Sequence, residues 1–193
     1  IIQIKMAWTE ARETKKEEIE AKLKSIGGDM LKIEYLENCL KKPIIFDVRK
    51  FVYLKLAELY EARGMFNESA KHVDGAAEIS ITFRDKMELY MRTAKLLIKH
   101  GSYYDADTQF EKALTCANSK EKEQLKKTYK EYYLERAKEF ESLKKMNNAI
   151  KVYEKLLMHR FVSDEEKKEI NPKLAVLYGK VGKIREAMQL EKK

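Results

Sequence analysis

Histidines and cysteines are the residues of this 193-residue chain best suited to chemistry, and there are only five of them. Metal sites and nucleophilic centres need such residues close together, at spacings such as CxxC or i and i+4 on a helix. None of His72, His100 and His159 has a second His or Cys at such a spacing, and Cys39 and Cys116 stand alone. We therefore expect neither a metal site nor a disulfide, and interpret the cysteines as small core residues and the histidines as helix-surface residues.

A phosphate-binding loop is the next candidate, because Gly179-Lys-Val-Gly182-Lys183 contains Gly followed by Lys. It lacks the four-residue gap before Gly-Lys and the Ser or Thr that follows in a phosphate loop. Carboxylates are abundant, but pairs such as Glu58 and Glu61 are interpreted as lying on charged helix faces. The sequence predicts no catalytic residue, no cofactor and no enzyme.

Composition indicates which elements build the chain. It is 44% hydrophobic and 37% charged, with only 7 Gly and 2 Pro, which favours long charged helices over a sheet with many turns. Charged residues interrupt every apolar stretch before it reaches roughly 18 residues, so no membrane insertion is expected. Residues 1–8 do not resemble a secretory signal, and we expect a cytoplasmic protein.

A repeat organises most of the chain. Leu56-Ala-Glu-Leu-Tyr60 is nearly repeated by Leu174-Ala-Val-Leu-Tyr178, and in both copies a Gly follows four residues after the Tyr, at Gly64 and Gly182. Two further copies lie between them. A period of 20 to 50 residues indicates an array of stacked supersecondary units.

The copies resemble tetratricopeptide repeats, which alternate large, small and aromatic positions around a turn Gly between two helices. The matching residues are Tyr53, Ala57, Tyr60, Gly64, Phe66, Ser69, Val73 and Ala76; Tyr90, Ala94, Leu97, Gly101, Tyr103, Ala106, Phe110 and Ala113; Tyr133, Ala137, Phe140, Lys144, Met146, Ala149, Tyr153 and Leu156; and Asn171, Ala175, Tyr178, Gly182, Ile184 and Ala187. Small residues let two helices approach closely, and large ones fill the space between neighbouring hairpins.

This resemblance implies an all-α fold, a right-handed α-solenoid of stacked antiparallel helical hairpins, in a single domain over 1–193. The predicted repeats cover 47–82, 85–118, 119–159 and 163–193, after a degenerate or capping hairpin at 17–41. The last hairpin has a short second helix, so we expect the chain to be a fragment of a longer array.

Local signals refine this outline. Lys144 replaces the turn Gly of the third copy, which predicts a different turn or a helix that continues further. The stretch 119–140 lacks Pro and Gly and predicts one unusually long helix. Asp47 is predicted to be the N-cap of its helix, and Ser163 to Glu166 form a predicted capping box.

In this family the first helices of successive hairpins line a concave groove, and the resemblance implies a groove here. Its predicted residues are Leu54, Lys55, Met91, Arg92, Lys95, Leu134, Lys138 and Lys173. The three apolar positions would form a strip flanked by lysines, suited to a peptide or helix with apolar anchors and acidic flanks. The predicted function is therefore a protein–protein interaction scaffold or adaptor. Alternatively, the three apolar residues close the core between helices and the lysines only aid solubility.

A second hypothesis is binding of RNA or other nucleic acid. Residues 119–193 carry twenty basic and thirteen acidic groups, a net charge of +7, against +1 for residues 1–118. Tyr132, Tyr133 and Phe140 lie among lysines and could stack on bases, although the repeat assigns Tyr133 and Phe140 to the core. Nucleic-acid binding would weaken steeply with salt, whereas binding in an apolar groove would not.

Overall fold

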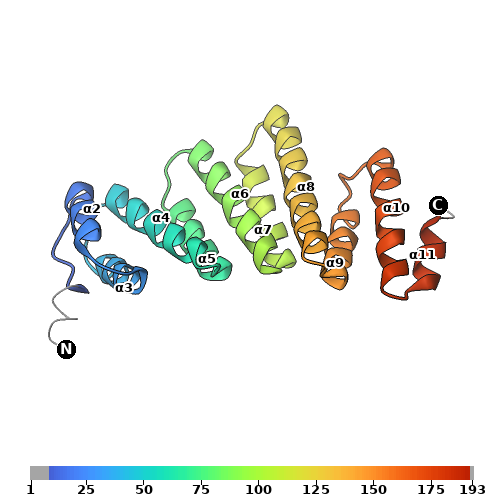
Figure 1. Cartoon of the computed structure of the whole chain (residues 1–193). Helices are drawn as coiled ribbons and strands as arrows, with labels where there is room; N and C mark the ends of the chain where they lie inside the picture. Colours follow the sequence, from blue (N-terminus) through green and yellow to red (C-terminus); the bar gives the residue numbers. More distant parts are fainter. Residues whose placement is uncertain (1–8, 192–193) are drawn as a thin grey trace. The chain divides into compact units, whose positions relative to one another are not determined.

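The computed structural model describes residues 9–191, and within this range every regular element is a helix. Residues 1–8 and 192–193, which include the N-terminal stretch tested for a secretory pattern, lie outside the described part. The helices are α2 (Lys16–Ser25), α3 (Asp29–Leu40), α4 (Phe46–Ala62), α5 (Phe66–Glu78), α6 (Phe83–His100), α7 (Tyr103–Thr115), α8 (Ser119–Ser142), α9 (Met146–Leu157), α10 (Asp164–Lys180) and α11 (Ile184–Glu191) (Figure 1). The fold is an all-α solenoid of helical hairpins, as the sequence predicts.

Two compact units make up the chain, Ile1–Ala117 and Asn118–Lys193. We call them the N-terminal unit, which contains α2 to α7, and the C-terminal unit, which contains α8 to α11. Each is described by itself. The assignment of all 193 residues to one domain remains a prediction.

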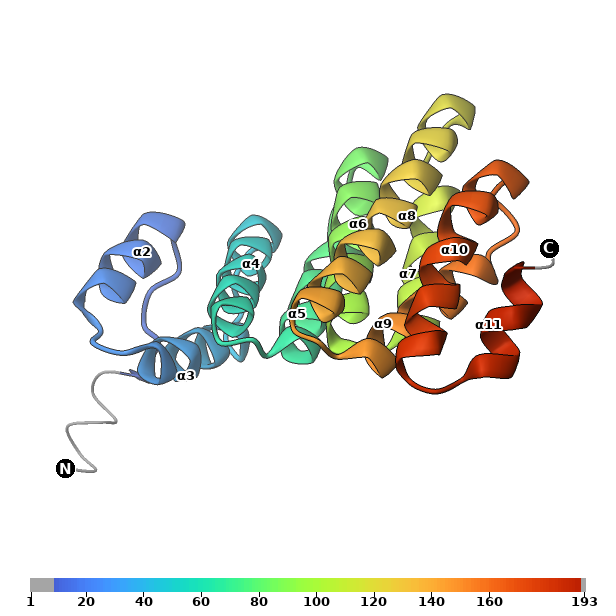
Figure 2. The same ribbon diagram turned by 45° about the vertical axis from the view of Figure 1, so that its right-hand side comes forward.

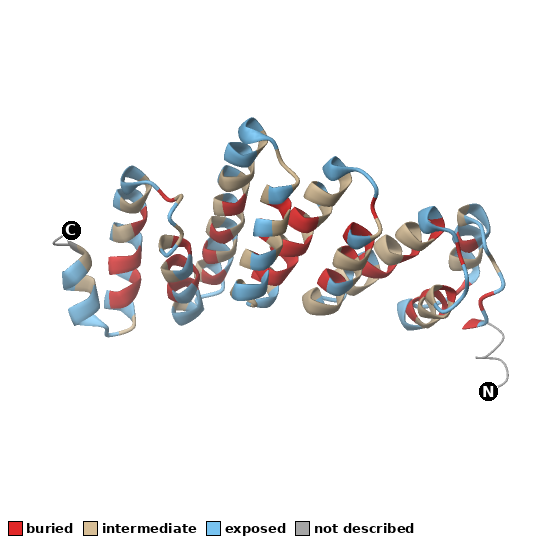
Figure 3. Ribbon diagram, turned by 180° about the vertical axis from the view of Figure 1, so that it is seen from behind, coloured by how far each residue is buried: buried red, intermediate tan, exposed pale blue. Residues whose placement is uncertain are grey.

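Small residues bring the helices of the N-terminal unit together. From α3 to α7 each helix packs against the next one along the chain. Ala57 on α4 and Ser69 on α5 are fully buried, and the Ser69 hydroxyl donates a 2.8 Å hydrogen bond to the Ala57 carbonyl. Ala94 and Ala106 are fully buried at the corresponding positions of α6 and α7. Figure 3 shows the buried residues on the sides of helices that face their neighbours.

The C-terminal unit is built around aromatic side chains of its longest helix. α8 has 24 residues, which confirms the predicted long helix. Tyr129 and Tyr133, one turn apart on α8, are fully buried, and Tyr153 of α9 is 1% exposed. The last helix, α11, packs against α10, yet Ile184 and Met188 remain more than half exposed.

The turn inside each of the four later hairpins has one geometry. The N–H group of the residue after the turn position donates to the carbonyl five residues earlier, in the bonds Met65 to Tyr60, Ser102 to Leu97, Lys145 to Phe140 and Lys183 to Tyr178 (2.9, 2.9, 2.8 and 2.9 Å). The turn residue has positive φ in every case: Gly64, Gly101, Lys144 and Gly182. The prediction that Lys144 produces a different turn is therefore wrong, because Lys144 adopts the left-handed conformation (φ 57°) that glycine supplies elsewhere.

Helix starts differ from one hairpin to the next. The predicted capping box of α10 is confirmed, since the Ser163 hydroxyl accepts from the Glu166 N–H (3.3 Å) and the Glu166 carboxylate accepts from the Ser163 N–H (2.8 Å). The prediction of Asp47 as an N-cap is wrong, because α4 begins at Phe46 with Ile45 as its cap. Asp47 lies in the first turn and forms an ion pair with Lys16 of α2.

Candidate functional site

A hollow of about 460 Å³ lies between α2, α3 and α4 of the N-terminal unit. Figure 2 shows α2 and α4 standing over α3, which forms the base of this part of the unit. The lining residues are Glu20, Leu23, Lys24, Lys32, Lys55, Glu58 and Leu59. Lys55 is the predicted groove residue that this hollow includes.

The floor of the hollow is apolar. Leu23 of α2 and Leu59 of α4 are half-buried and pack against the hydrophobic core of this end of the unit. That core contains fully buried residues such as Ile19, Leu36 and Leu56, which hold the three helices together. A ligand side chain placed on the two leucines would therefore contact a fixed apolar surface rather than mobile loop residues.

The rim of the hollow carries ammonium groups. Lys55 donates a 2.9 Å hydrogen bond to the Glu58 carboxylate, which neutralises one of them. Neither Lys24 nor Lys32 forms an ion pair with another described residue. The carboxylate of Glu20 is also at the rim, so the lining has three basic and two acidic groups. An apolar floor beside two available ammonium groups suits a large apolar side chain with a neighbouring carboxylate.

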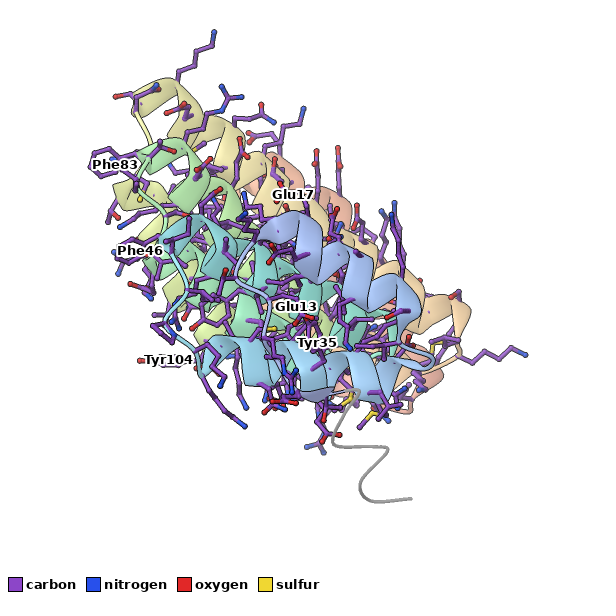
Figure 4. All side chains as sticks on the ribbon, turned by 90° about the vertical axis from the view of Figure 1, so that its left-hand side faces the viewer. Glu13, Glu17, Tyr35, Phe46, Phe83 and Tyr104 are labelled. Carbon is purple, nitrogen blue, oxygen red and sulfur yellow. The ribbon has the colours of Figure 1, made fainter. Side chains whose placement is uncertain are left out.

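A segment ahead of α2 fixes the base of the hollow. The buried Tyr35 hydroxyl of α3 donates to the Glu13 carboxylate (2.9 Å; Figure 4), and the Asn38 side-chain amide donates to the Thr9 carbonyl (3.0 Å). Burial, and then the bond to Glu13, raises the pKa of Tyr35 far above its usual range. Burial alone would raise the pKa of Glu13, but hydrogen bonds from the Arg12 amide and Tyr35 hold it below its usual value. Glu13 is thus ionised at neutral pH and anchors the segment to α3.

Ion pairs organise the neighbouring surface formed by α4 and α6. The Glu61 carboxylate accepts from both Arg92 (3.3 Å) and Lys99 (3.4 Å), and all three side chains are about one-third exposed. The predicted groove residues Arg92 and Lys95 are therefore half-buried on α6, with Arg92 joined to α4. These ion pairs fix the position of α4 relative to α6, each of which is the first helix of its hairpin.

The predicted apolar strip is not exposed. Met91 is 4% exposed and lies in the packing of α6, so its expected place on an open groove surface is wrong. Leu54 and Leu134 are half-buried. Burial of these side chains helps close the packing between helices. Their position therefore matches the alternative that the three apolar residues belong to the core. Lys138 and Lys173 are exposed on the C-terminal unit.

Two histidines are more buried than expected. His72 stacks on Tyr60 with ring centroids 5.3 Å apart, and burial lowers its pKa. His159 stacks on Phe161 at 4.9 Å and contacts the ring of Tyr133. The prediction of surface histidines is right only for His100, the last residue of α6, because helix-surface patterns do not reveal aromatic neighbours from other elements.

The cysteines also differ from each other. Cys39 is fully buried, and burial raises the pKa of its thiol to about 11. Cys116 is half-buried near the end of the N-terminal unit. Both are free thiols, and only Cys39 fits the predicted small core residue fully.

Residues 9–191 contain neither a metal-binding cluster nor a membrane-spanning helix. That part of the chain brings no three His, Cys, Asp or Glu side chains together in an arrangement that could hold a metal ion. None of its helices combines the length and the apolar character needed to cross a bilayer.

A second hollow, of about 240 Å³, lies between α5, α6 and α7 of the same unit. Its lining includes the acidic residues Asp74 and Asp105, and its one lysine, Lys71, is paired with Glu68 at 2.7 Å. It is smaller than the first hollow and lacks unpaired ammonium groups.

The sequence did not indicate the main hollow because three of its residues belong to α2. Glu20, Leu23 and Lys24 lie in the predicted degenerate or capping hairpin at 17–41. Leu23 and Lys24 lie opposite Leu59 only because α2, α3 and α4 pack together. A local sequence pattern therefore could not have indicated this arrangement.

Neither a protein-family model nor a curated protein sequence matches this chain. Among solved structures, it is similar to two crystal structures of MamA, each at 16% identity: one covers 92% of this chain and 89% of that chain with a TM-score of 0.39, and the other 100% and 90% with 0.42. It is also similar to BtubC (BKLC) from P. vanneervenii, at 17% identity, over 90% of this chain and 72% of that chain, with a TM-score of 0.39. Likenesses at this level carry no argument about function.

Proposed function

We propose that this protein is a tetratricopeptide-like interaction scaffold or adaptor that binds a segment of another protein, with the hollow between α2, α3 and α4 as its main anchoring point. The observation that carries the proposal is the apolar floor of Leu23 and Leu59 beside the unpaired ammonium groups of Lys24 and Lys32. The bound segment would be extended or helical, with a large apolar side chain flanked by carboxylates.

The other groove positions of the N-terminal unit act around this anchor. Lys55 on α4, and Arg92 and Lys95 on α6, would contact acidic flanks of the segment, and Leu54 would contact an apolar side chain of it. Met91 supports α6 from within. Lys138 and Lys173 offer exposed positive charge on the C-terminal unit. The protein works by binding, with no catalysis and no cofactor, and its four later hairpins are four copies of the repeat.

Peptide display on the full chain tests this function. The library would carry a central Leu or Phe flanked either by Asp and Glu or by Lys and Arg, and the acidic set should be enriched. A selected peptide should lose at least about tenfold in affinity when Lys24→Glu and Lys32→Glu are combined. The control, Lys120→Glu with Lys122→Glu on the exposed start of α8, changes the net charge equally and should retain binding.

Two results would contradict the proposal. One is no preference for acidic flanks in the library. The other is equal affinity for the wild type and the Lys24→Glu, Lys32→Glu variant, since the ammonium groups of the hollow would then not contribute.

Nucleic-acid binding is the second candidate, favoured by the net charge of +7 on residues 119–193. Its stacking component is weak, because Tyr133 is fully buried and Phe140 is 8% exposed. Lys130 is also paired with Glu166, and Arg136 with Glu139. Binding of a single-stranded RNA oligonucleotide, measured by anisotropy at increasing salt, tests it: affinity that falls steeply with salt and persists in the Lys24→Glu, Lys32→Glu variant would support this candidate.

A further inference from the structure

Four large apolar side chains protrude at the starts of two helices in the N-terminal unit. Ile45 is 69% exposed, Phe46 72%, Ile81 91% and Phe83 72%. Aromatic and aliphatic side chains of this size are usually buried, and clusters that remain exposed mark interaction surfaces. We call these four residues the aromatic edge.

The exposed residues of the aromatic edge recur with the period of the repeat. Phe46 is the first residue of α4 and Phe83 the first residue of α6, and the two lie 37 residues apart, the same interval as between Ser69 and Ala106. A 2.8 Å ion pair between Lys50 and Asp85 joins the first turns of the two helices. Figure 4 shows Phe46 and Phe83 on the same border of the molecule.

Local helix structure does not account for these side chains. Ile81 precedes the N-cap Thr82, a position from which an apolar residue can pack onto the first turn of the helix. An exposed fraction of 91% shows that Ile81 makes no such contact. The edge also differs from the proposed peptide site, whose hollow is lined from the sides of α2, α3 and α4 rather than from helix starts.

Basic groups surround the edge. Residues 41–50 and 81–86 contain six basic side chains and two acidic ones. Asp47 is paired with Lys16, Asp85 with Lys50, and Arg84 with Glu88 just outside these ranges. The excess positive charge therefore comes from Lys41, Lys42, Arg49 and Lys86. A partner of this surface must therefore accept protruding apolar side chains and carry negative charge.

We propose that the aromatic edge docks the protein on an anionic lipid surface. Phe46, Phe83 and Ile81 would enter the boundary between headgroups and acyl chains, while neighbouring basic side chains such as Lys42 and Lys86 contact anionic headgroups. A bilayer yields to protruding side chains at any spacing, whereas a folded protein would need a matching cavity for each. This mode lies on the membrane and requires no spanning helix.

Vesicle co-sedimentation with the full chain tests the proposal. The probes are phosphatidylcholine vesicles with and without about 30 mol% phosphatidylserine, a fraction that gives a strongly negative surface. The wild type should partition onto the anionic vesicles only, and increasing salt should weaken the binding. Phe46→Glu with Phe83→Glu should reduce partitioning by at least about tenfold, because two apolar contacts are lost and two negative charges are gained.

The matched control is Met30→Glu with Met65→Glu. These residues are 59% and 43% exposed and lie at the starts of other helices, Met30 in the first turn of α3 and Met65 at the N-cap of α5. The control variant should partition like the wild type. All variants should keep wild-type helical content and wild-type affinity for a peptide selected on the hollow.

Three outcomes would overturn the proposal. The first is no partitioning of the wild type onto anionic vesicles. The second is equal partitioning of the wild type and the Phe46→Glu, Phe83→Glu variant. The third is a wild type that self-associates in sedimentation while this variant is monomeric and vesicles bind neither, which would make the edge a contact between two copies of the chain.

Discussion

The two units differ in the residues that begin the first helices of their hairpins. In the N-terminal unit, α4 and α6 begin with Phe46 and Phe83, both exposed, whereas α8 and α10 of the C-terminal unit begin with Ser119 and Asp164. Tyr129 and Tyr133 inside α8 are buried, as are Tyr35 and Phe110 of the N-terminal unit, and the two α8 rings meet edge to face at 5.3 Å. One hairpin pattern thus leaves the first helical position free either for local stabilisation or for contact with a partner.

Capping explains how the C-terminal unit can use polar starts. Asn118 and Ser163 each form a complete capping box, which satisfies N–H groups that a helix start leaves unpaired. Ile45 makes no side-chain cap for α4, and the start of that helix is held by the ion pair between Asp47 and Lys16. At α4 an ion pair between helices is therefore present where a side-chain cap is absent. α6 also begins with an apolar residue, but it is capped locally, because the Thr82 hydroxyl accepts a 3.0 Å hydrogen bond from the Asp85 N–H.

The largest expected change in the free energy of unfolding comes from replacing a buried aromatic residue, in contrast with an exposed one. Tyr133→Ala should lower the free energy of unfolding by about 3–5 kcal/mol, because it removes a fully buried ring from the core of the C-terminal unit. Phe83→Ala should change it by less than about 0.5 kcal/mol, since the ring is largely in solvent. Urea denaturation with hydrogen exchange of each unit measures both, and equal losses would contradict the comparison.

The hairpin turns provide the next effect. Lys144 adopts a left-handed conformation that costs a non-glycine residue about 1–2 kcal/mol, so Lys144→Gly should stabilise the C-terminal unit by about 1 kcal/mol. Gly101→Ala should destabilise the N-terminal unit by a similar amount, because φ there is 99°. No atom lies within 4 Å of a Cβ added at Gly101, so a loss would reflect the backbone alone. Thermal unfolding of both variants would reveal opposite shifts, and shifts of the same sign would show that the turn conformation does not control stability.

Changes to helix caps should alter the free energy of unfolding by a smaller amount, in opposite directions for α10 and α4. Ser163→Ala should cost about 1 kcal/mol because α10 loses its capping box, whereas Ile45→Asp should gain up to about 1 kcal/mol by giving α4 the side-chain cap it lacks. The Ile45→Asp variant should also weaken vesicle binding if the aromatic edge acts as proposed. Chemical denaturation of the two variants measures the pair, and a loss in both would mean that Ile45 contributes to packing in spite of its exposure.

The sequence predicted the fold well because the repeat is a packing pattern. Ala57 and Ala94 lie where helices contact each other, so spacing alone indicated the hairpins and the three turns that contain glycine. The turn at Lys144 was predicted wrongly. The groove was harder, because whether Met91 or Leu54 faces solvent depends on the rotation of each helix against two neighbours. The aromatic edge had no signal, because one exposed Phe at a helix start looks like any first core position until burial is known.

Titration of His72 is the smallest expected effect and concerns the N-terminal unit only. Burial lowers the pKa of His72 beside Tyr60 and Tyr53, so the folded chain holds this proton less tightly than the unfolded chain. As the pH falls below the ordinary histidine pKa of about 6.5, the unfolded state therefore binds more protons than the folded state. Stability is lost between this pKa and the lower pKa of His72 in the folded chain. His72→Gln should flatten this loss in denaturation curves recorded between about pH 7 and 5. An unchanged pH dependence in the His72→Gln variant would assign the loss to other groups, such as Glu13, whose lowered pKa acts at lower pH.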